Sequence, residues 1–468
     1  MNKIKVVATI GSTGIDEKVI SSLIDNGVDA IKINMNDVSR EEARKVIEMV
    51  RVLNGRLDVA VGTMIEIGSP LVRLGKISNG KCYFKTGDKI RIYTENTLGD
   101  DTKVSVNYKE IVDEVNREDY IIIDNGRIKL RVYDKGSDYL VCEVLKGGEV
   151  FEYSPIYIKN DSNLPFLKIK DIKDIEFISQ VNADFICLPH IKSSDDIMQV
   201  TDMLIGLQND HTNVVARIDN ENAILDIDDI VKVSDGILID RTSLSMEVAM
   251  ERIPGLQKII INKCLRMGKF AIASVDIPLN SNADPNRIEV QDIANAILDG
   301  VDALMINDSV DVTSPYISSL KNLEAIIKEV EVGIDYVTLF ENASREENSD
   351  VTGMIATNVA SSANKLNCKA IITPTISGYT ARKISRFRPN CPIIAASPSL
   401  ETVTSLSLNF GIAPVLIEDL NSLDKIIKVS EKITKGLITL EKGDKIIITG
   451  GYPFKESKNT NFMKIEEI

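Results

Sequence analysis

Hydrophobic and polar positions along the chain repeat in one pattern: an apolar helix face, a turn of Asn, Asp or Gly, and a short apolar strand. The clearest instance is residues 285–308, whose predicted helix carries apolar side chains on one face at Ile288, Ile293, Ala296 and Ile297. Gly300 ends this helix, because glycine leaves a last turn without a Cβ penalty. Residues 303–306 then form a strand of the kind that is covered on both faces. Asn307 and Asp308 follow it, at the carboxyl end where α/β proteins place their chemistry.

Similar strands are predicted seven more times, and helical segments separate nearly all of them. A helix end, a turn and a strand recur within residues 23–34, 178–188 and 230–240, and shorter apolar runs lie at residues 5–9, 58–63, 213–218 and 270–274. Eight strands that alternate with helices predict a closed (β/α)8 barrel, the TIM barrel. A doubly wound open sheet is the alternative that the strand count leaves open.

Two other regions differ from the barrel pattern. Residues 68–160 alternate apolar and polar positions in runs broken by Lys135-Gly136 and Gly147-Gly148, which is typical of β-hairpins. This all-β domain interrupts the barrel after its third strand, where a lid and a rigid ornament are both open interpretations. After a polar break at residues 341–350, strands alternate with helices again, which predicts an open α/β domain. We expect the barrel at residues 1–67 and 161–335, the inserted lid at 68–160 and the C-terminal α/β domain at 336–468.

Composition narrows the class of function. The formal net charge of −14 on 468 residues disfavours general binding to nucleic acid or to an anionic membrane surface. The six cysteines are scattered without a CxxC pair, so we expect free thiols and a cytoplasmic location. Only two histidines occur, which disfavours a His-rich metal cage. No apolar run is long enough to span a membrane, and we expect no signal peptide before the first strand.

Several sequence blocks resemble the pyruvate kinase family, and the resemblance extends along the whole chain. The longest is PNRIEVQDIANAILDGVDALM at residues 285–305. Others are VVATIG (6–11), IKINMND (31–37), VVARIDN (214–220), DGILIDR (235–241) and TISGYTARKISRFRP (375–389). The resemblance implies phosphoryl transfer from phosphoenolpyruvate to ADP in the cytoplasm, by a homotetramer that uses Mg²⁺ or Mn²⁺ and K⁺.

The resemblance implies catalytic residues at the strand ends, and this chain departs from the family at most of them. The family's phosphate-clamping arginine corresponds to Lys32, and its essential lysine corresponds to Arg217. The number of positive charges is kept, but the planar guanidinium group of arginine and the compact ammonium group of lysine exchange positions. The Mg²⁺ ligands correspond to Asp219, one methylene shorter than the family's glutamate, and to Ser243, a neutral hydroxyl in place of an aspartate.

Contacts to the substrate and to a monovalent cation are also changed. The resemblance implies substrate binding by Arg241, Thr242 and Ser243, with Thr242 in place of a glycine that lets the backbone approach a carboxylate. The family's threonine that helps to protonate the enolate corresponds to Val275. Its K⁺ ligands correspond to Asn34, Asn36, Gly62 and Thr63, with one charged ligand lost at Gly62.

Further charged side chains are expected near the same rim, at His190, Asp240, Asp276 and Asp308. A histidine there titrates near neutral pH and is a candidate for proton transfer. Salt bridges and a hydrogen-bonded rim histidine are the simpler interpretation of His190, Asp240 and Asp308. Asp276 stays open because it adjoins Val275.

The C-terminal domain carries a second candidate site. Thr375, Ser377, Gly378 and Thr380 follow a predicted strand and open a helix, so hydroxyl groups and backbone N–H groups are placed to cradle an anion. An ordinary Ser/Thr helix cap is the alternative. The resemblance implies that this loop binds a phosphate of a small phosphorylated effector.

These observations lead to one expected function and three alternatives. We expect a pyruvate kinase paralogue with weak or no turnover that binds a phosphorylated metabolite and acts in regulation. The first alternative is a working glycolytic pyruvate kinase with a rearranged Mg²⁺ and K⁺ site. The second is a different enzyme that uses Asp219 and a divalent metal on a carboxylate or phosphate substrate. The third is an interaction module that pairs with a true pyruvate kinase.

Overall fold

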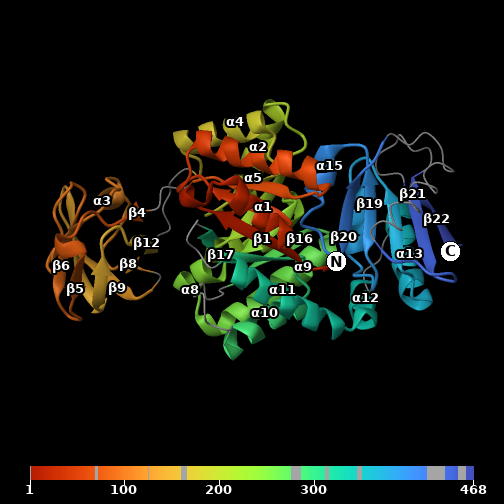
Figure 1. Cartoon of the computed structure of the whole chain (residues 1–468). Coiled ribbons are helices and arrows are strands. Elements are labelled where there is room, and N and C mark those ends of the chain that lie inside the picture. Colours follow the sequence, from red (N-terminus) through yellow and green to blue (C-terminus); the bar gives the residue numbers. More distant parts are fainter. Residues whose placement is uncertain are drawn as a thin grey trace.

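Three parts of the molecule lie side by side in one line, with a β-rich insert at one end, a barrel in the middle and a second sheet at the other end (Figure 1). The computed structural model describes residues 2–68, 72–124, 126–159, 166–275, 286–310, 316–344, 350–418, 438–451 and 460–468. None of the helices described there has both the length and the apolar character that crossing a membrane requires.

Eight parallel strands close into a barrel, which confirms the predicted TIM barrel and excludes the open sheet. In hydrogen-bonding order the strands are β1 (Lys5–Ile10), β17 (Ala303–Val310), β16 (Phe270–Val275), β15 (Gly236–Ile239), β14 (Asn213–Ile218), β13 (Phe185–Leu188), β3 (Gly62–Glu66) and β2 (Ala30–Asn34). Bulky apolar side chains such as Met64, Phe185 and Phe270 fill the interior, so the barrel is a packed core.

Helices cover the outer face of the barrel (Figure 1). The longer ones are α1 (Glu17–Asp25), α2 (Arg40–Leu57), α4 (Ile169–Val181), α5 (Ser194–Gly206), α9 (Ile253–Met267), α10 (Arg287–Asp299) and α11 (Tyr316–Val332). Shorter ones are α6 (Glu221–Leu225), α7 (Ile227–Val233) and α8 (Arg241–Glu247). The helix predicted within residues 285–308 is α10. A capping box of Asn286 and Glu289 begins this helix, and Gly300, in the left-handed conformation, ends it.

The third barrel strand lies further along the chain than the sequence predicts. The apolar run at residues 58–63 suggested the strand, but α2 continues to Leu57 and Asp58 caps it with a φ of 53°. The strand β3 therefore begins at Gly62 and ends at Glu66. Its register pairs Ile31 with Thr63 and Asn34 with Glu66, so Thr63 lies near the start of the strand.

Two further expectations concern the end of the barrel sequence. The strand β17 continues through Asn307 and Asp308 to Val310, four residues beyond the predicted end. The side chains of Asn307 and Asp308, and the whole of Asp276, lie outside the described residues. The predicted charges at Asp276 and Asp308 therefore stay predictions.

The described residues of the inserted part form mainly β-strands, as predicted, together with the one-turn helix α3 (Ile111–Glu114) and a 3-10 turn at Ser78–Gly80. Its seven-stranded sheet has the order β4 (Val72–Arg73), β12 (Pro155–Lys159), β8 (Tyr120–Ile123), β9 (Ile128–Lys135), β10 (Tyr139–Lys146), β6 (Lys89–Tyr93) and β7 (Lys103–Ser105). A two-stranded sheet pairs β11 (Gly148–Phe151) with β5 (Lys81–Phe84). The insert has a hydrophobic core of its own.

The C-terminal part is a five-stranded sheet with helices, as predicted for an α/β domain. The strands run in the order β20 (Ile412–Leu416), β19 (Ile393–Ser397), β18 (Ala370–Pro374), β21 (Lys445–Gly451) and β22 (Thr460–Glu467). The last strand is antiparallel to its neighbour, which makes the sheet mixed. Its described helices are α12 (Tyr336–Ser344), α13 (Val351–Leu366), α14 (Tyr379–Ser385) and α15 (Leu400–Ser405). The helix predicted near residues 422–434 lies outside the described residues.

Candidate active site at the barrel mouth

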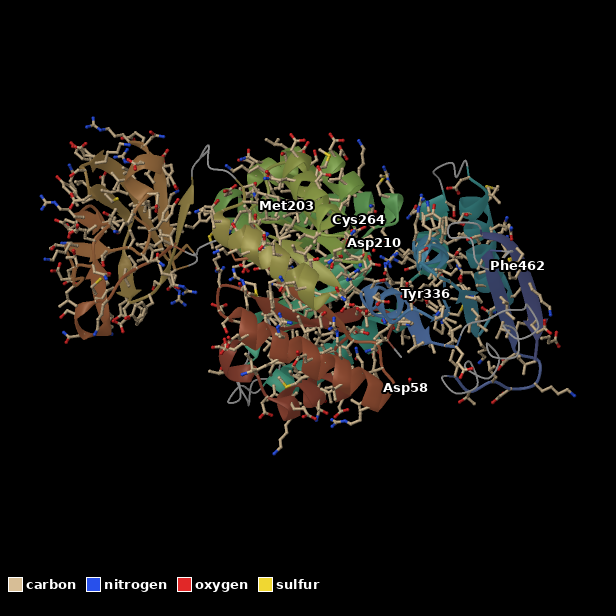
Figure 2. The ribbon with its side chains drawn as sticks, turned by 90° about the horizontal axis from the view of Figure 1, so that it is seen from above. Asp58, Met203, Asp210, Cys264, Tyr336 and Phe462 are labelled. Atoms are coloured by element: carbon tan, nitrogen blue, oxygen red, sulfur yellow. The ribbon has the colours of Figure 1, made fainter. Side chains whose placement is uncertain are left out.

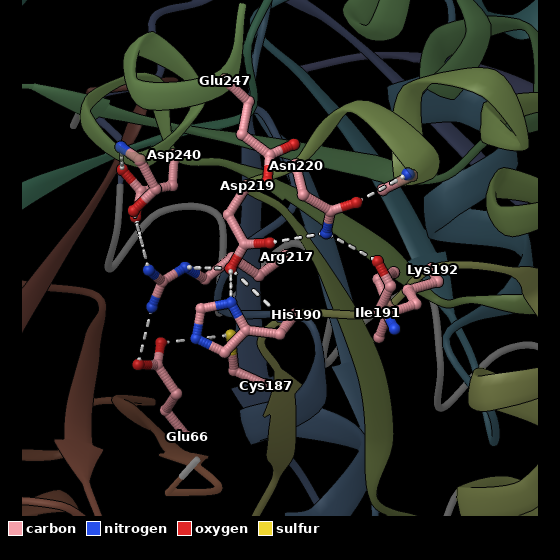
Figure 3. Close-up of polar contacts among 12 residues, drawn as sticks. Glu66, Cys187, His190, Ile191, Lys192, Arg217, Asp219, Asn220, Asp240 and Glu247 are labelled. Carbon is pink, nitrogen blue, oxygen red and sulfur yellow. Dashed lines mark hydrogen bonds and ion pairs between the residues drawn. The ribbon is translucent and has the colours of Figure 1, made fainter. Parts of the chain in front are cut away.

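Arg217, near the carboxyl end of β14, lies among three carboxylates (Figure 3). Its Nη1 is 2.9 Å from Glu66 Oε1, its Nε is 3.3 Å from Asp219 Oδ2, and its Nη2 is 2.7 Å from Asp240 Oδ2. The carboxylates come from the ends of three different segments, because parallel strands bring their carboxyl ends to one rim. Burial alone would lower the pKa of the Arg217 guanidinium, but the three negative neighbours raise it above its usual range.

Glu66 joins Arg217 to the second predicted catalytic cation. The ammonium group of Lys32 lies 2.7 Å from Glu66 Oε2, and both side chains are buried. Cys187 Sγ and Asn34 Nδ2 donate hydrogen bonds to the same carboxylate. Burial opposes ionisation of Glu66, yet Lys32 and Arg217 hold the pKa of its carboxyl at about 2. Glu66 is therefore an anion that forms ion pairs with both cations.

Asp219 is buried, and both of its carboxylate oxygens have protein partners (Figure 3). The Oδ2 atom lies 3.2 Å from Nδ1 of His190 and accepts the backbone N–H of the same residue at 3.1 Å. The Oδ1 atom accepts a hydrogen bond of 2.9 Å from Asn220 Nδ2. His190 has a φ of 56°, an uncommon conformation that directs its backbone N–H and its ring to one carboxylate.

Ser243 lies in the first turn of α8, next to its capping residue Asp240. The backbone N–H of Ser243 donates to Asp240 Oδ1, and its hydroxyl donates to Asp240 Oδ2 over 2.8 Å. Arg217 Nη2 donates to the Ser243 hydroxyl over 3.1 Å. The guanidinium of Arg217 therefore contacts both Asp219 and Ser243, the two residues that correspond to the family's Mg²⁺ ligands.

These donors do not fit a divalent cation. Mg²⁺ requires several oxygen ligands in near-octahedral geometry, and anionic oxygens bind it best. Asp219 uses both oxygens on protein groups, Ser243 is neutral, and a guanidinium lies within 3.3 Å of both. Across the part of the chain that the structure describes, no group of three or more His, Cys, Asp and Glu side chains is arranged to hold a metal ion.

The four residues that correspond to the K⁺ ligands are not brought together. Asn34 and Asn36 lie at the mouth, where the Asn34 side chain accepts the backbone N–H of Asn36. Gly62 and Thr63 lie at the other end of β3, where Thr63 donates its backbone N–H and its hydroxyl to Asp184 at 2.7 Å each. The expectation that Thr63 joins the two asparagines is therefore wrong, because β3 begins where the predicted strand was to end.

The other predicted substrate contacts lie beside the carboxylate cluster. Arg241 Nε donates to the Ser274 carbonyl oxygen at 2.9 Å, and its Nη1 pairs with Asp292 of α10. The Arg241 guanidinium therefore lies against the neighbouring helix α10. The carbonyl oxygen of Thr242 accepts a hydrogen bond from the Ser245 hydroxyl within α8. Val275 is completely buried at the end of β16.

The loop of the C-terminal candidate site is well ordered by internal bonds. Thr375 Oγ1 accepts the backbone N–H of Gly378, which caps α14 with a φ of 74°. The hydroxyl of Thr380 shares a hydrogen bond of 2.6 Å with that of Thr460. The N-cap residue of α14 is Gly378, and the Thr375 hydroxyl accepts its backbone N–H. Ser377 is partly exposed, and Arg382 donates to its carbonyl oxygen.

Sequence reasoning missed Glu66, which is central to the mouth. The signal was a single acidic residue at the end of an apolar run, in GTMIE. Because the predicted strand ended at Thr63, Glu66 fell outside it. Glu66 pairs with both Arg217 and Lys32. With Glu66 included, the described cluster has two cations and three carboxylates, an excess of one negative charge.

Comparison with known proteins agrees with the fold and with the resemblance. The family pattern described as "Pyruvate kinase, barrel domain" matches residues 1–314, and "Pyruvate kinase, alpha/beta domain" matches residues 353–466. The pyruvate kinase of Clostridium perfringens (strain 13 / Type A) is 30% identical over 474 aligned residues, covering 100% of both chains. Those of Sporosarcina psychrophila and Staphylococcus aureus (strain MRSA252) are 30% and 31% identical, covering 100% of this chain and 81% of theirs. The chain therefore belongs to the pyruvate kinase family.

Proposed function

We propose that the chain is a pyruvate kinase homologue whose barrel mouth transfers phosphoryl groups weakly or not at all. The observation that carries the proposal is the position of Arg217, whose guanidinium contacts Asp219 and Ser243 at 3.3 and 3.1 Å. A fixed protein cation thus takes the place that a divalent metal needs. Glu66 in turn holds Arg217 and Lys32 in ion pairs, which compete with a phosphate for both cations.

Phosphoryl transfer makes this arrangement costly. The protein's part in that chemistry is mostly positioning and stabilisation of the negative charge on the moving group. Loss of one preorganised charge contact costs about 2.7–4 kcal/mol, or roughly 100- to 1000-fold in rate. The cluster of Glu66, Asp219 and Asp240 with Lys32 and Arg217 has more carboxylates than cations, which also disfavours a substrate as negative as phosphoenolpyruvate. Weak or absent turnover follows, although such losses do not add simply.

A binding and regulatory role accompanies this proposal. The C-terminal loop of Thr375, Ser377, Gly378 and Thr380 is the part of the chain that would bind a small phosphorylated metabolite. Its ordered glycine cap and its partly exposed Ser377 support that role. In this account the chain acts in the cytoplasm as a homo-oligomer, a tetramer by analogy with its family.

A working glycolytic kinase with a rearranged site is the second candidate. The observation in its favour is that Lys32 and Arg217 both stay at the mouth and share one carboxylate, Glu66. If a substrate phosphate displaced Glu66, the two cations would be free to bind it. Such an enzyme requires Mg²⁺ or Mn²⁺ and K⁺ by family resemblance, and it would have to bind the divalent ion with ligands other than the pair Asp219 and Ser243.

A coupled assay with phosphoenolpyruvate, ADP, K⁺ and either Mg²⁺ or Mn²⁺ separates the two candidates. For a weak or inactive mouth we expect turnover below about 1 s⁻¹, the lower end of ordinary enzyme rates. Glu66→Gln is the variant to compare with the unaltered chain in this assay, because it removes the anion that competes with phosphate for both cations. Turnover above that limit in the unaltered chain, abolished in Arg217→Met, would establish the second candidate instead.

A further inference from the structure

The seven-stranded sheet of the insert has one buried face and one open face. Alternate residues of β6, β9 and β10 are buried in the core of the insert, namely Ile90, Ile92, Leu130, Val132, Leu140 and Cys142. Successive side chains of a strand point to opposite faces, so the residues between these form the other face, which we call the outer face. The described side chains of the outer face on these three strands are exposed or partly exposed. Figures 1 and 2 show the insert at one end of the molecule, and Figure 1 shows β6 on the side away from the barrel, so the outer face is open to a partner.

Tyrosines and cations gather on the outer face. Cross-strand pairs place Tyr139 opposite Tyr93, and Tyr120 of β8 opposite Arg131. The described tyrosines and cations of the face include Tyr93, Tyr120, Tyr133, Tyr139, Lys89, Arg91, Lys129 and Arg131. Residues 68–160 hold eight of the 12 tyrosines of the chain. A surface that combines aromatic rings with cations in this way is typical of proteins that bind single-stranded nucleic acid.

Three of these cations lie over tyrosine rings. The distances from the charged group to the ring centroid are 3.1 Å for Lys89 over Tyr133, 4.4 Å for Lys129 over Tyr120 and 5.7 Å for Arg91 over Tyr139. The attraction between an exposed cation and a ring is weaker than the stacking of a nucleic-acid base on that ring. A base can therefore replace the cation, whose flexible side chain then reaches a phosphate.

Carboxylates on and beside the outer face are paired with two arginines. Arg131 lies 2.6 Å from Glu143 and 3.1 Å from Glu118. Arg117 lies 2.6 Å from Asp134. Three carboxylates against two guanidinium groups leave this set of ion pairs with one negative charge.

Two cations of the outer face remain after these charges are balanced. Lys89, on the same face, offsets the one negative charge of the ion pairs. Lys103 of β7 lies opposite Arg91 and interacts with Asp100, which offsets its charge. Arg91 and Lys129 carry the positive charge that is left: over the described ranges their side chains contact tyrosine rings and form no ion pair.

The negative net charge of the chain lies outside the insert. Residues 68–160 contain 15 lysines and arginines and 15 aspartates and glutamates, whereas the whole chain has 55 and 69. Exposed charges more than about 10 Å apart are largely screened from one another at roughly 0.1 M salt. The net charge of −14 therefore does not prevent an anion from binding to the outer face, which lies on a neutral domain at one end of the molecule.

From this surface we propose that the insert binds single-stranded nucleic acid along the outer face of β6, β8, β9 and β10. Unpaired bases stack on Tyr133 and Tyr139, and backbone phosphates pair with Arg91 and Lys129. A duplex keeps its bases stacked on one another and is bound less tightly. Every base has a face that can stack, so the surface has no strong sequence preference. None of these residues belongs to the barrel mouth, so binding here does not depend on the proposed function.

Fluorescence anisotropy of the full chain with labelled oligothymidylate and oligouridylate of about 12 nucleotides tests this surface. A DNA duplex of the same length and heparin, a polyanion without bases, are the comparison probes. We expect a Kd of about 1–100 µM for at least one single strand at about 50 mM salt, and weaker binding of the duplex. With about three phosphates contacted, a rise to about 200 mM salt should weaken the binding roughly 20-fold. Binding of only one single strand would support the proposal and identify the sugar that the surface accepts.

Two double variants separate stacking from charge. Tyr133→Leu/Tyr139→Leu removes two rings and is expected to weaken single-strand binding at least about tenfold, while any binding of heparin stays unchanged. Arg91→Gln/Lys129→Gln is expected to reduce the slope of log affinity against log salt by about 1.4, because each phosphate contact contributes about 0.7 to that slope.

Each double variant has a matched control within the insert. Tyr83→Leu/Phe151→Leu removes two exposed rings from the two-stranded sheet, and Lys76→Gln/Lys109→Gln removes two exposed cations outside both sheets. Both controls are expected to bind the single strand as the unaltered chain does. Absence of saturable binding of either single strand at about 50 mM salt would overturn the proposal. So would duplex or heparin binding as tight as that of the single strands, or equal loss of affinity in the ring variant and its control.

Discussion

The guanidinium of Arg217 donates a hydrogen bond to the hydroxyl of Ser243 over 3.1 Å. The same guanidinium lies 3.3 Å from Asp219 and 2.7 Å from Asp240. Positions that the resemblance assigns to a lysine and two metal ligands are thus joined directly to one another here. The substitutions compensate each other, since the longer, forked arginine reaches the space that a shorter serine leaves, and its charge balances the carboxylate that stays.

Glu66→Gln should destabilise the fold by about 3 kcal/mol at about pH 7, because the carboxylate balances Lys32 and Arg217. The folded-state pKa of Glu66, about 2, lies below its ordinary value of 4.5. A carboxyl with a lowered pKa contributes its full stability above the ordinary value and loses it as the pH falls towards the folded value. The difference between wild type and variant should therefore shrink from about pH 4.5 to about pH 2.

The free energy of unfolding, measured by chemical denaturation at several pH values, checks this prediction. Glu149→Gln is the control, because its ion pair with Lys81 is more than half exposed and should contribute under about 1 kcal/mol. A Glu66→Gln difference that does not depend on pH would show that Glu66 is not ionised in the folded protein.

Arg388→Met should destabilise the junction of barrel and C-terminal domain by about 3–5 kcal/mol, because it leaves the buried carboxylate of Asp302 without its partner. The two side chains are 2% and 5% exposed, and Arg388 also packs on the ring of Phe410 at 4.3 Å. Arg127→Met removes a pair with Asp124 on the exposed surface of the insert and should cost less than about 1 kcal/mol. Similar losses for the two variants in denaturant titrations would contradict a role for Arg388 in holding the domains together.

Ser377→Glu should abolish the rise in melting temperature that a sugar phosphate produces, because it adds a negative charge where the phosphate would bind. The backbone of the loop should stay in place, since Thr375, Gly378 and Arg382 fix it without the Ser377 side chain. Ser137→Glu, which adds the same charge on the exposed surface of the insert, is the matched control. If both variants keep the shift, the phosphate binds elsewhere; if the unaltered chain shows no shift with any sugar phosphate tested, the effector role is wrong.

The fold was predictable because its signals are local and repeated. Apolar runs marked all eight barrel strands, a helix end and an Asn, Asp or Gly turn preceded four of them, and residues 213–218 agree with β14 at both ends. The boundary of β3 was not predictable in this way, since Val59 and Val61 are as apolar as strand residues but lie in the segment between α2 and β3. The C-cap of α2 at Asp58 determined that boundary. In the folded chain the end of the helix outweighs the strand propensity of the residues that follow it.

The site was predictable only in part, for a related reason. The resemblance identified Lys32, Arg217, Asp219 and Ser243, and the structure brings all of them to one rim. Their ion pairs depend on Glu66 and on the reach of one arginine, which no spacing along the chain reveals. Charges that lie far apart in sequence, such as Glu66 and Arg217, pair only once the barrel has closed.

Arg217→Lys/Ser243→Asp should create a divalent-metal site that the unaltered chain lacks. The shorter reach of lysine withdraws the cation, and a second carboxylate faces Asp219. We expect Mn²⁺ affinity to rise at least about tenfold, as measured by calorimetry. Ser245→Asp, two residues further along α8, adds the same charge as a control and should not raise the affinity.

Titration of the unaltered chain with Mn²⁺, followed by electron paramagnetic resonance of the free ion, tests most directly whether Arg217 takes the place of the metal. We expect no specific site for Mn²⁺ with a Kd below about 1 mM, either alone or with phosphoenolpyruvate present. One Mn²⁺ bound per chain more tightly than this, and lost in Asp219→Asn, would contradict it.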